Sequence, residues 1–143
     1  MLADAPTEQA VLDTLGRFIT GYQSGDIDAV VDTLVPDADL VLLGTAADER
    51  RIGIDGARSQ FERDISQSQS RSLQIGWTSI SAAGDVAWLA AELMVTAVAD
   101  GESITFPVRL TAVFEQRDGT WKIAQAHLSV PDSSTSEGQS FPT

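Results

Sequence analysis

The second half of this 143-residue chain consists of four long runs in which apolar and polar side chains alternate. The runs cover residues 73–82, 86–99, 103–117 and 120–130, and turns of two or three residues separate them. Two of the turns are Asp-Gly pairs, Asp100-Gly101 and Asp118-Gly119, which strongly favour a tight hairpin. Connections this short join strands that are neighbours in a sheet. The pattern therefore predicts a four-stranded antiparallel meander.

The first half of the chain has a helical period, with apolar residues three or four positions apart. Three helices are expected, each bounded by residues that cap or break a helix. The expected bounds are a cap at Pro6-Thr7 and an end at Ser24-Gly25 for the first, a cap at Asp26 and an end at Pro36 for the second, and a cap at Asp55 with an exit at 67–71 for the third. Between the last two helices, a short buried strand at 40–43 leads into a polar loop or hairpin tip at 44–51.

These elements predict a single α+β domain over residues 1–131, in which about three N-terminal helices cover one face of a strongly curved antiparallel sheet. The run 103–117 has the two unequal sides that such a sheet needs. Apolar side chains alternate from Ile104 to Phe114 on one side, and the other side carries Thr105, Arg109, Thr111 and Glu115. The polar tail at 132–143 is expected to be disordered.

The preceding run, 86–99, has bulky side chains on both sides. Leu89 and Leu93 fall on the apolar side, whereas Trp88, Glu92 and Met94 fall on the other. We therefore expect the second face to be buried as well. A face that mixes apolar, charged and polar side chains suits either a dimer interface or a pocket with a few polar groups, and the pattern does not choose between them.

The composition excludes several classes of function. With 21 acidic and 9 basic side chains, the net charge of −12 repels a phosphate backbone, so nucleic acid is not an expected partner. No run approaches the roughly 20 apolar residues of a membrane span, and the first residues lack the pattern of a secretory signal, so we expect a cytoplasmic protein. The absence of cysteine, of Gly-rich phosphate loops and of carboxylate clusters with metal-ligand spacing implies no cofactor and no metal.

The most distinctive motif covers residues 109–131. It consists of Arg-x-Thr-x-Val, an Arg-Asp-Gly turn and Trp-x-Ile-x-x-x-His-x-Ser-x-Pro, and it is carried by Arg109, Thr111, Val113, Arg117, Asp118, Gly119, Trp121, Ile123, His127, Ser129 and Pro131. With the layout of helices and strands before it, this ending resembles the SnoaL-like family of the nuclear transport factor 2-like superfamily. It is also similar to the association domain of calcium/calmodulin-dependent kinase.

The resemblance implies a cone-shaped, cystatin-like α+β barrel with a pocket, and a homodimer formed through the sheet. Members of the family include polyketide cyclases, ketosteroid isomerases, dehydratases and oligomerisation modules, so the fold does not assign a reaction. Ketosteroid isomerases combine an aspartate base with a tyrosine and a protonated aspartic acid. That arrangement cannot be placed here, because the alternating runs contain no aspartate within a strand.

Three strand residues are candidates for catalysis. His127, the only histidine, can act as a general acid or base because an imidazole titrates near about pH 6.5. The alternation places it on the same strand face as Trp121 and Ser129, where a hydrogen-bonded structural role is the alternative. Glu92 and Arg109 lie near the middle of adjacent runs. They would form a buried ion pair or present a carboxylate and a guanidinium to a ligand.

Other side chains are candidates for contact with a ligand. Tyr22 ends the apolar stripe of the first helix, where its hydroxyl can reach a cavity. Asp48 lies in the polar loop, which would line the mouth of a pocket or form a solvated tip. The remaining candidates belong to the sheet, and these are Trp77, Trp88, Thr111 and Ser129. The two tryptophans would stack on a flat ligand or fill the sheet face.

Three hypotheses of function follow. In the first, the protein binds a small, mostly apolar organic molecule in a cavity between helices and sheet, without an assigned reaction. In the second, it is a cofactor-free isomerase, cyclase or dehydratase in which His127 or Glu92 moves a proton and Arg109 stabilises oxyanion charge. In the third, it is a homo-oligomerisation module without a ligand. The first two require an open apolar cavity with converging polar groups.

Overall fold

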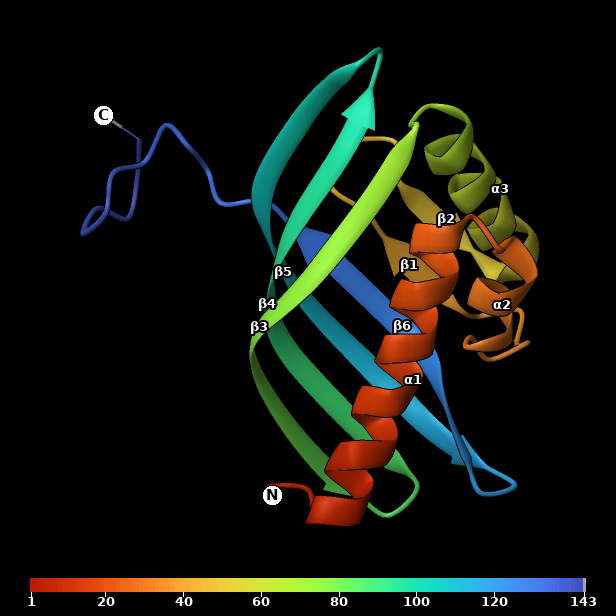
Figure 1. The fold of residues 1–143 in the computed structure, drawn as a ribbon. Helices are drawn as coiled ribbons and strands as arrows, with labels where there is room; N and C mark the ends of the chain where they lie inside the picture. Colours follow the sequence, from red (N-terminus) through yellow and green to blue (C-terminus); the bar gives the residue numbers. More distant parts are fainter. Residues whose placement is uncertain (143) are drawn as a thin grey trace.

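A computed structural model shows an α+β domain in which helices pack on one face of a curved sheet, as predicted (Figure 1). The structure describes residues 1–142. Its elements are α1 (Ala5–Ser24), α2 (Ile27–Asp32), β1 (Val41–Leu43), β2 (Arg50–Ile52), α3 (Gly53–Ser66), β3 (Ser70–Ala83), β4 (Val86–Ala99), β5 (Glu102–Arg117) and β6 (Thr120–Ser129). After β6 the chain leaves the domain, and residues 132–142 contain no helix or strand. The last position of the predicted tail, 143, lies outside the described residues.

The strands named above form one sheet with the order β2-β1-β6-β5-β4-β3. Strands β3 to β6 are the antiparallel meander that the alternating runs predict. At the two predicted Asp-Gly turns, Asp100 and Asp118 both have φ of 52°, and the glycines after them have φ of 76° and 77°. Two consecutive left-handed residues are what a two-residue hairpin turn requires. The sequence pattern did not indicate the parallel pairing of β1 with β6.

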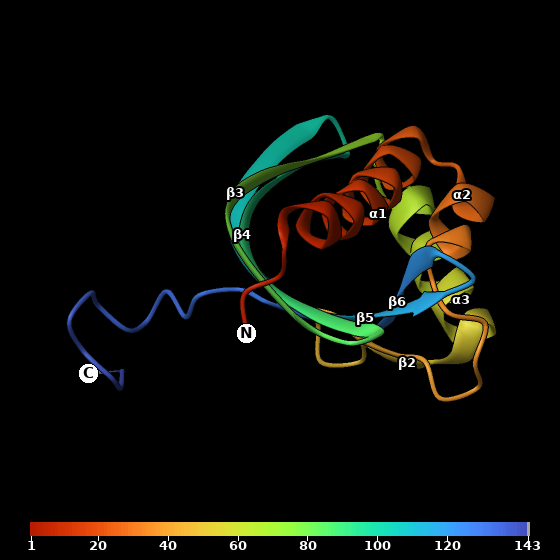
Figure 2. The same cartoon turned by 90° about the horizontal axis from the view of Figure 1, so that it is seen from below.

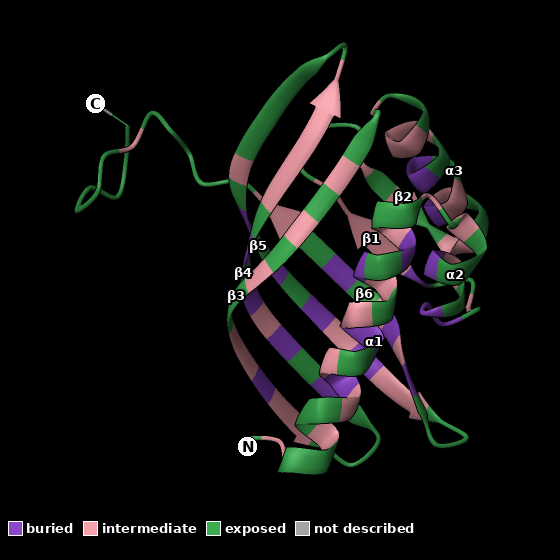
Figure 3. Ribbon diagram, viewed as in Figure 1, coloured by how far each residue is buried: buried purple, intermediate pink, exposed green. Residues whose placement is uncertain are grey.

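The sheet curves around α1, and α2 and α3 lie beside the same concave face (Figure 2). We call this concave side the inner face and the opposite side the outer face. The core fills the space between the inner face and the helices, and Figure 3 marks its buried residues at intervals along α1 and the strands. Val11, Leu34, Leu89 and Phe114 are among the fully buried residues. Within residues 1–142, no helix is long and apolar enough to cross a membrane.

Two of the three predicted helix caps differ from the structure. The cap of α1 is Asp4, whose carboxylate accepts a hydrogen bond from the Thr7 amide at 2.9 Å. Pro6 lies inside the first turn, where its missing N–H has no cost. Helix α2 is capped by Asp26, as predicted. Helix α3 begins at Gly53, which has φ of 73°, so the predicted cap Asp55 is instead an acidic residue of the first turn.

A β-bulge in β6 overturns the predicted grouping of Trp121 with His127. Phe114 of β5 pairs with Ile123, but the next pair toward the end of β6 is Val113 with Gln125, so Ala124 is an extra residue. An extra residue reverses the alternation of side chains beyond it. Trp121 is therefore buried on the inner face, whereas His127 is exposed on the outer face.

Candidate functional site

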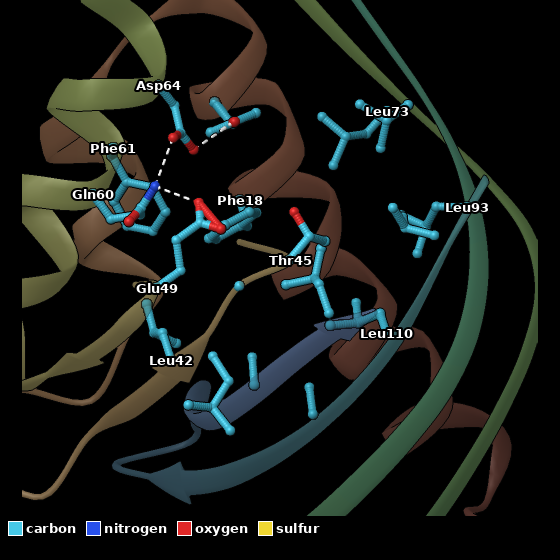
Figure 4. Close-up of a pocket in the computed structure, with 18 of the residues that line it drawn as sticks. Phe18, Leu42, Thr45, Glu49, Gln60, Phe61, Asp64, Leu73, Leu93 and Leu110 are labelled. Carbon is cyan, nitrogen blue, oxygen red and sulfur yellow. Dashed lines mark hydrogen bonds between the residues drawn. The ribbon is translucent and has the colours of Figure 1, made fainter. Parts of the chain in front are cut away.

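A cavity of about 180 Å³ lies between the inner face of the sheet and helices α1 and α3 (Figure 4). Most of its wall is apolar. The apolar wall consists of Leu15, Phe18, Ile19, Leu34, Leu42, Leu43, Phe61, Leu73, Leu93, Val95, Phe106, Val108, Leu110, Ala112, Ile123, Ala126 and Leu128. Leu93, Val95, Phe106, Val108, Leu110 and Ala112 are alternating residues that the strand pattern assigned to the core, so the cavity is a part of the core that the side chains leave open.

Polar groups meet on one side of this cavity, where α1, α3 and the loop between β1 and β2 come together. The Tyr22 hydroxyl of α1 donates a hydrogen bond to Asp64 Oδ2 at 2.8 Å. The Gln60 amide donates to Asp64 Oδ1 at 2.7 Å and to Glu49 Oε1 at 2.8 Å. One amide group thus bridges two carboxylates. We call Tyr22, Glu49, Gln60 and Asp64 the polar network.

The loop between β1 and β2 is folded so that Glu49 turns back into the cavity. The Glu49 carbonyl accepts a hydrogen bond from Gly44 N at 2.8 Å, and its carboxylate accepts one from Ala46 N at 2.6 Å. A Cβ atom at position 44 would lie 2.7 Å from Glu49 Oε2, which is closer than non-bonded atoms approach. Glycine at this position therefore makes room for the carboxylate.

Burial changes the acid-base properties of the network. It raises the pKa of the Asp64 carboxyl, and the nearby charge of Glu49 acts in the same direction. The hydrogen bonds from Tyr22 and Gln60 oppose that rise, because they favour the charged carboxylate. Burial also raises the pKa of Tyr22, and the charge of Asp64 raises it further. The tyrosine therefore stays protonated and serves as a hydrogen-bond donor.

Two of the residues predicted to contact a ligand lie at or near this site. Tyr22 lines the cavity. Asp48 lies outside it, because its carboxylate binds the Arg63 guanidinium through hydrogen bonds of 2.7 and 3.3 Å. The neighbouring residue, Glu49, contributes the carboxylate of the loop to the cavity wall.

The other seven predicted residues are gathered on the outer face of the sheet. Their pairing places them in three rows across the strands. The first row is Trp77, Glu92, Arg109 and Ser129, the second contains Thr111 and His127, and the third contains Trp88. Glu92 lies directly opposite Arg109, on the adjacent strand where the alternation placed it. None of the seven lines the cavity.

Sequence reasoning expected the loop that contains Glu49 at the mouth of a pocket but chose Asp48 from it, and it did not identify Gln60 or Asp64. Gln60 and Asp64 are four positions apart on α3, so they share one side of the helix next to its buried residue Phe61. That spacing beside Phe61 was a usable signal in the sequence. In the structure Gln60 is only 7% exposed, and a buried amide requires hydrogen-bond partners. Glu49 had no such signal, since its direction depends on the fold of the loop.

This arrangement is suited to holding a compact molecule. The apolar wall can enclose a hydrocarbon body, while the polar network can orient one polar group of the ligand. The network also contains a carboxyl group with a raised pKa inside a cavity, which is the condition for general acid-base chemistry.

Comparison with known proteins agrees with this architecture. The sequence profile of the SnoaL-like domain matches residues 11–133. No curated protein matches the chain. Among solved structures, a nuclear transport factor 2-like superfamily protein from Salmonella enterica has a TM-score of 0.84 at 16% identity, with 97% of this chain and 100% of that chain covered.

Two further similar structures are named for specific roles. One, from Xanthomonas campestris, is assigned as a calcium/calmodulin dependent protein kinase II association domain; its TM-score is 0.77 at 26% identity, with 92% of this chain and 90% of that chain covered. Another, from Novosphingobium aromaticivorans, is assigned as a scytalone dehydratase; its TM-score is 0.80 at 12% identity, with 88% of this chain and 85% of that chain covered. Such distant likenesses concern the fold.

Proposed function

Because the chain belongs to the SnoaL-like domain family of the nuclear transport factor 2-like superfamily, we propose that it binds a small, mostly apolar organic molecule in its cavity. The observation that carries this proposal is an apolar cavity of about 180 Å³ with a polar network on one side. An apolar cavity of roughly 150 Å³ is enough to hold benzene. The ligand is therefore expected to be about the size of one substituted ring.

NMR titration with toluene and benzyl alcohol tests this proposal. Binding should shift the methyl signals of cavity residues such as Leu93 and Ala126. The variant Ala112→Leu places extra carbon atoms in the cavity wall and should abolish the shifts. Ala83→Leu is the matched control, because Ala83 is exposed at the end of β3 and outside the cavity. Absence of binding in the wild-type protein, or equal binding to Ala112→Leu, would contradict the proposal.

A second candidate function is proton transfer to or from the bound molecule, as in an isomerase, cyclase or dehydratase. The raised pKa of Asp64 and its contact with Tyr22 inside the cavity favour it. We assign the acid-base role to Asp64, because His127 and Glu92 lie on the outer face. Dehydration of scytalone, the compound named for one similar structure, is the first reaction to assay. Asp64→Asn should abolish any turnover, and His127→Ala should retain it.

The outer face supports the proposal of a homodimer through the sheet. Trp77, Trp88 and Met94 are 57%, 40% and 43% exposed there, which is unusual for side chains of this size. The Glu92 and Arg109 side chains lie opposite each other among them. Burial of this face against a second copy would cover the tryptophans without closing the cavity.

The expected location of the protein in the cytoplasm also stays a prediction.

A further inference from the structure

The polar network uses its hydrogen-bond donors internally. Both hydrogens of the Gln60 amide go to carboxylates, and the single hydrogen of the Tyr22 hydroxyl goes to Asp64. The Gln60 carbonyl accepts from Arg51 Nε at 3.0 Å, so it is occupied as well. A ligand that needed a donor would have to break one of these bonds or use the terminal nitrogens of Arg51, which also lines the cavity.

Acceptor capacity, in contrast, remains free. A carboxylate has about four lone-pair sites. Asp64 receives two hydrogen bonds, and Glu49 receives one from Gln60 and one from Ala46 N, with Arg63 at 3.5 Å. Arg63 makes its hydrogen bonds to Asp48, outside the cavity, and its 3.5 Å contact with Glu49 is a longer ion pair. The polar network itself therefore offers acceptors more readily than donors.

The two carboxylates also repel each other. Both bind the same amide nitrogen, so their charges are held close together, and burial reduces the screening by water. A cation that entered the cavity between them would remove this repulsion and would use the free lone pairs in charge-assisted hydrogen bonds.

Aromatic rings surround the same end of the cavity. Phe18, Tyr22 and Phe61 form one cluster, with ring centroids 5.6 to 6.2 Å apart. Phe61 stands nearly perpendicular to the other two rings, at 75° and 77°. The faces of aromatic rings attract cations, and this attraction is larger when water is excluded. The Tyr22 ring already has the Arg71 guanidinium over it, 5.9 Å from the centroid, so Phe18 and Phe61 are the rings that favour the same kind of ligand group as the carboxylates.

We propose that the cavity selects a protonated amine carried on a compact apolar body of about one ring. The ammonium group would lie between Glu49 and Asp64, beside the aromatic cluster, and the ring would lie against the apolar wall. This inference rests on the proposed function, since the site is the cavity itself. It adds the charge and chemical class of the ligand. The opposing alternative is a carboxylate held by Arg51, which lines the same cavity.

Four ligands with the same ring test the inference: toluene, benzyl alcohol, benzylamine and benzoate. At neutral pH benzylamine carries a positive charge and benzoate a negative one. We expect the dissociation constant of benzylamine, measured by NMR titration, to be at least about tenfold lower than that of benzyl alcohol, and benzoate to bind more weakly than either. If toluene and benzyl alcohol bind but benzylamine has no advantage, this inference is wrong while the proposed function stands. If none of the four binds, the proposed function itself fails.

Charge-neutral variants identify the groups responsible. Glu49→Gln and Asp64→Asn keep the shape of the site and should each reduce the preference for benzylamine over benzyl alcohol, while toluene still binds. Toluene binding shows that the variant remains folded with an open cavity. Glu62→Gln is the control, because it removes one negative charge from the exposed side of the same helix. An equal loss of preference in all three variants would show that net charge, and not the site, attracts the amine.

Discussion

The Tyr22 hydroxyl and the Asp64 carboxylate are joined by a hydrogen bond of 2.8 Å that links α1 to α3 across the end of the cavity. The two residues are 42 positions apart in the chain, so this contact exists only in the folded protein. It holds the carboxylate in place and keeps the phenol protonated. Both the stability of the helix pair and the chemistry of the cavity therefore depend on it.

Ionisation of Tyr22 should occur only when the protein unfolds. Burial raises the pKa of Tyr22 above its ordinary value of 10.0, so the stabilisation is complete below that pH and is lost as the pH rises above it. Because Tyr22 is the only tyrosine, the phenolate absorbance reports this residue alone. We expect the absorbance to rise together with the loss of circular dichroism. A rise in the fully folded protein would show that the phenol is accessible to water.

Stability should depend on the protonation of Asp64. Burial raises the pKa of Asp64 above its ordinary value of 3.8, so its contribution to stability is complete below that pH and decreases as the pH rises through the folded-state pKa. Asp64→Asn has no such proton. The free energy of unfolding of the wild type, minus that of the variant, should therefore decrease as the pH rises above about 4 in urea titrations. A constant difference would contradict the raised pKa.

Replacement of Thr14 by valine should destabilise the protein by about 1 to 3 kcal/mol. Thr14 is 1% exposed, and its hydroxyl donates a hydrogen bond to the Trp121 carbonyl at 2.8 Å, which ties α1 to β6. Valine keeps the shape of threonine but leaves that carbonyl without this donor. Urea unfolding measures the change. Thr14→Ser retains the hydroxyl and removes only the methyl group, so it should lose less stability. An equal or larger loss would show that packing of the methyl group matters as much as the hydrogen bond.

Replacement of Gly44 by alanine should weaken amine binding without unfolding the domain. The new Cβ would lie 2.7 Å from Glu49 Oε2, so the carboxylate would have to move away from its present position. The preference for benzylamine over benzyl alcohol should fall, while toluene binding should persist. Ala83→Leu is the control, because it adds carbon atoms at an exposed position outside the cavity. Gly84→Ala is unsuitable, because Gly84 has a positive φ that strains alanine. Unchanged benzylamine binding would show that Glu49 is not needed.

The homodimer proposal predicts that charge on the outer face separates the subunits. Trp77→Glu should give a monomer in sedimentation velocity experiments, because it places a charge in an apolar interface. Ile104→Glu is the matched control. Ile104 is 53% exposed, close to the 57% of Trp77, but its alternation places it on the opposite side of the sheet. A wild-type protein that is already monomeric would refute the proposal.

The meander was predictable because its determinants are local. Alternation along each strand and the Asp-Gly turns are visible within short windows, and the bounds of β4 agree with its predicted run. The cap of α2 at Asp26 was found for the same reason. The cap of α1 was misplaced by two or three positions, since Asp4 and Thr7 both suit a helix start and only the backbone decides between them.

The site was less predictable because it depends on contacts between distant segments. Tyr22 was identified, but its partner Asp64 comes from another helix, and Glu49 comes from a loop between two short strands. The alternation placed Glu92 and Arg109 near the middle of adjacent strands, yet it does not tell which face the helices cover. For His127, the extra residue Ala124 also reversed the expected relation to Trp121.

Because Ala124 is an extra residue in β6, the side chains that face the cavity depend on the number of residues in this strand as well as on their identity. Loss of Ala124 would restore uninterrupted alternation, so the segment 125–129 would have to turn over relative to the rest of β6. His127 would then point toward the helices, and Ala126 and Leu128 would point toward solvent. A single-codon deletion would thus exchange an apolar wall for a titratable one without any substitution, a short genetic route by which this barrel could acquire new chemistry.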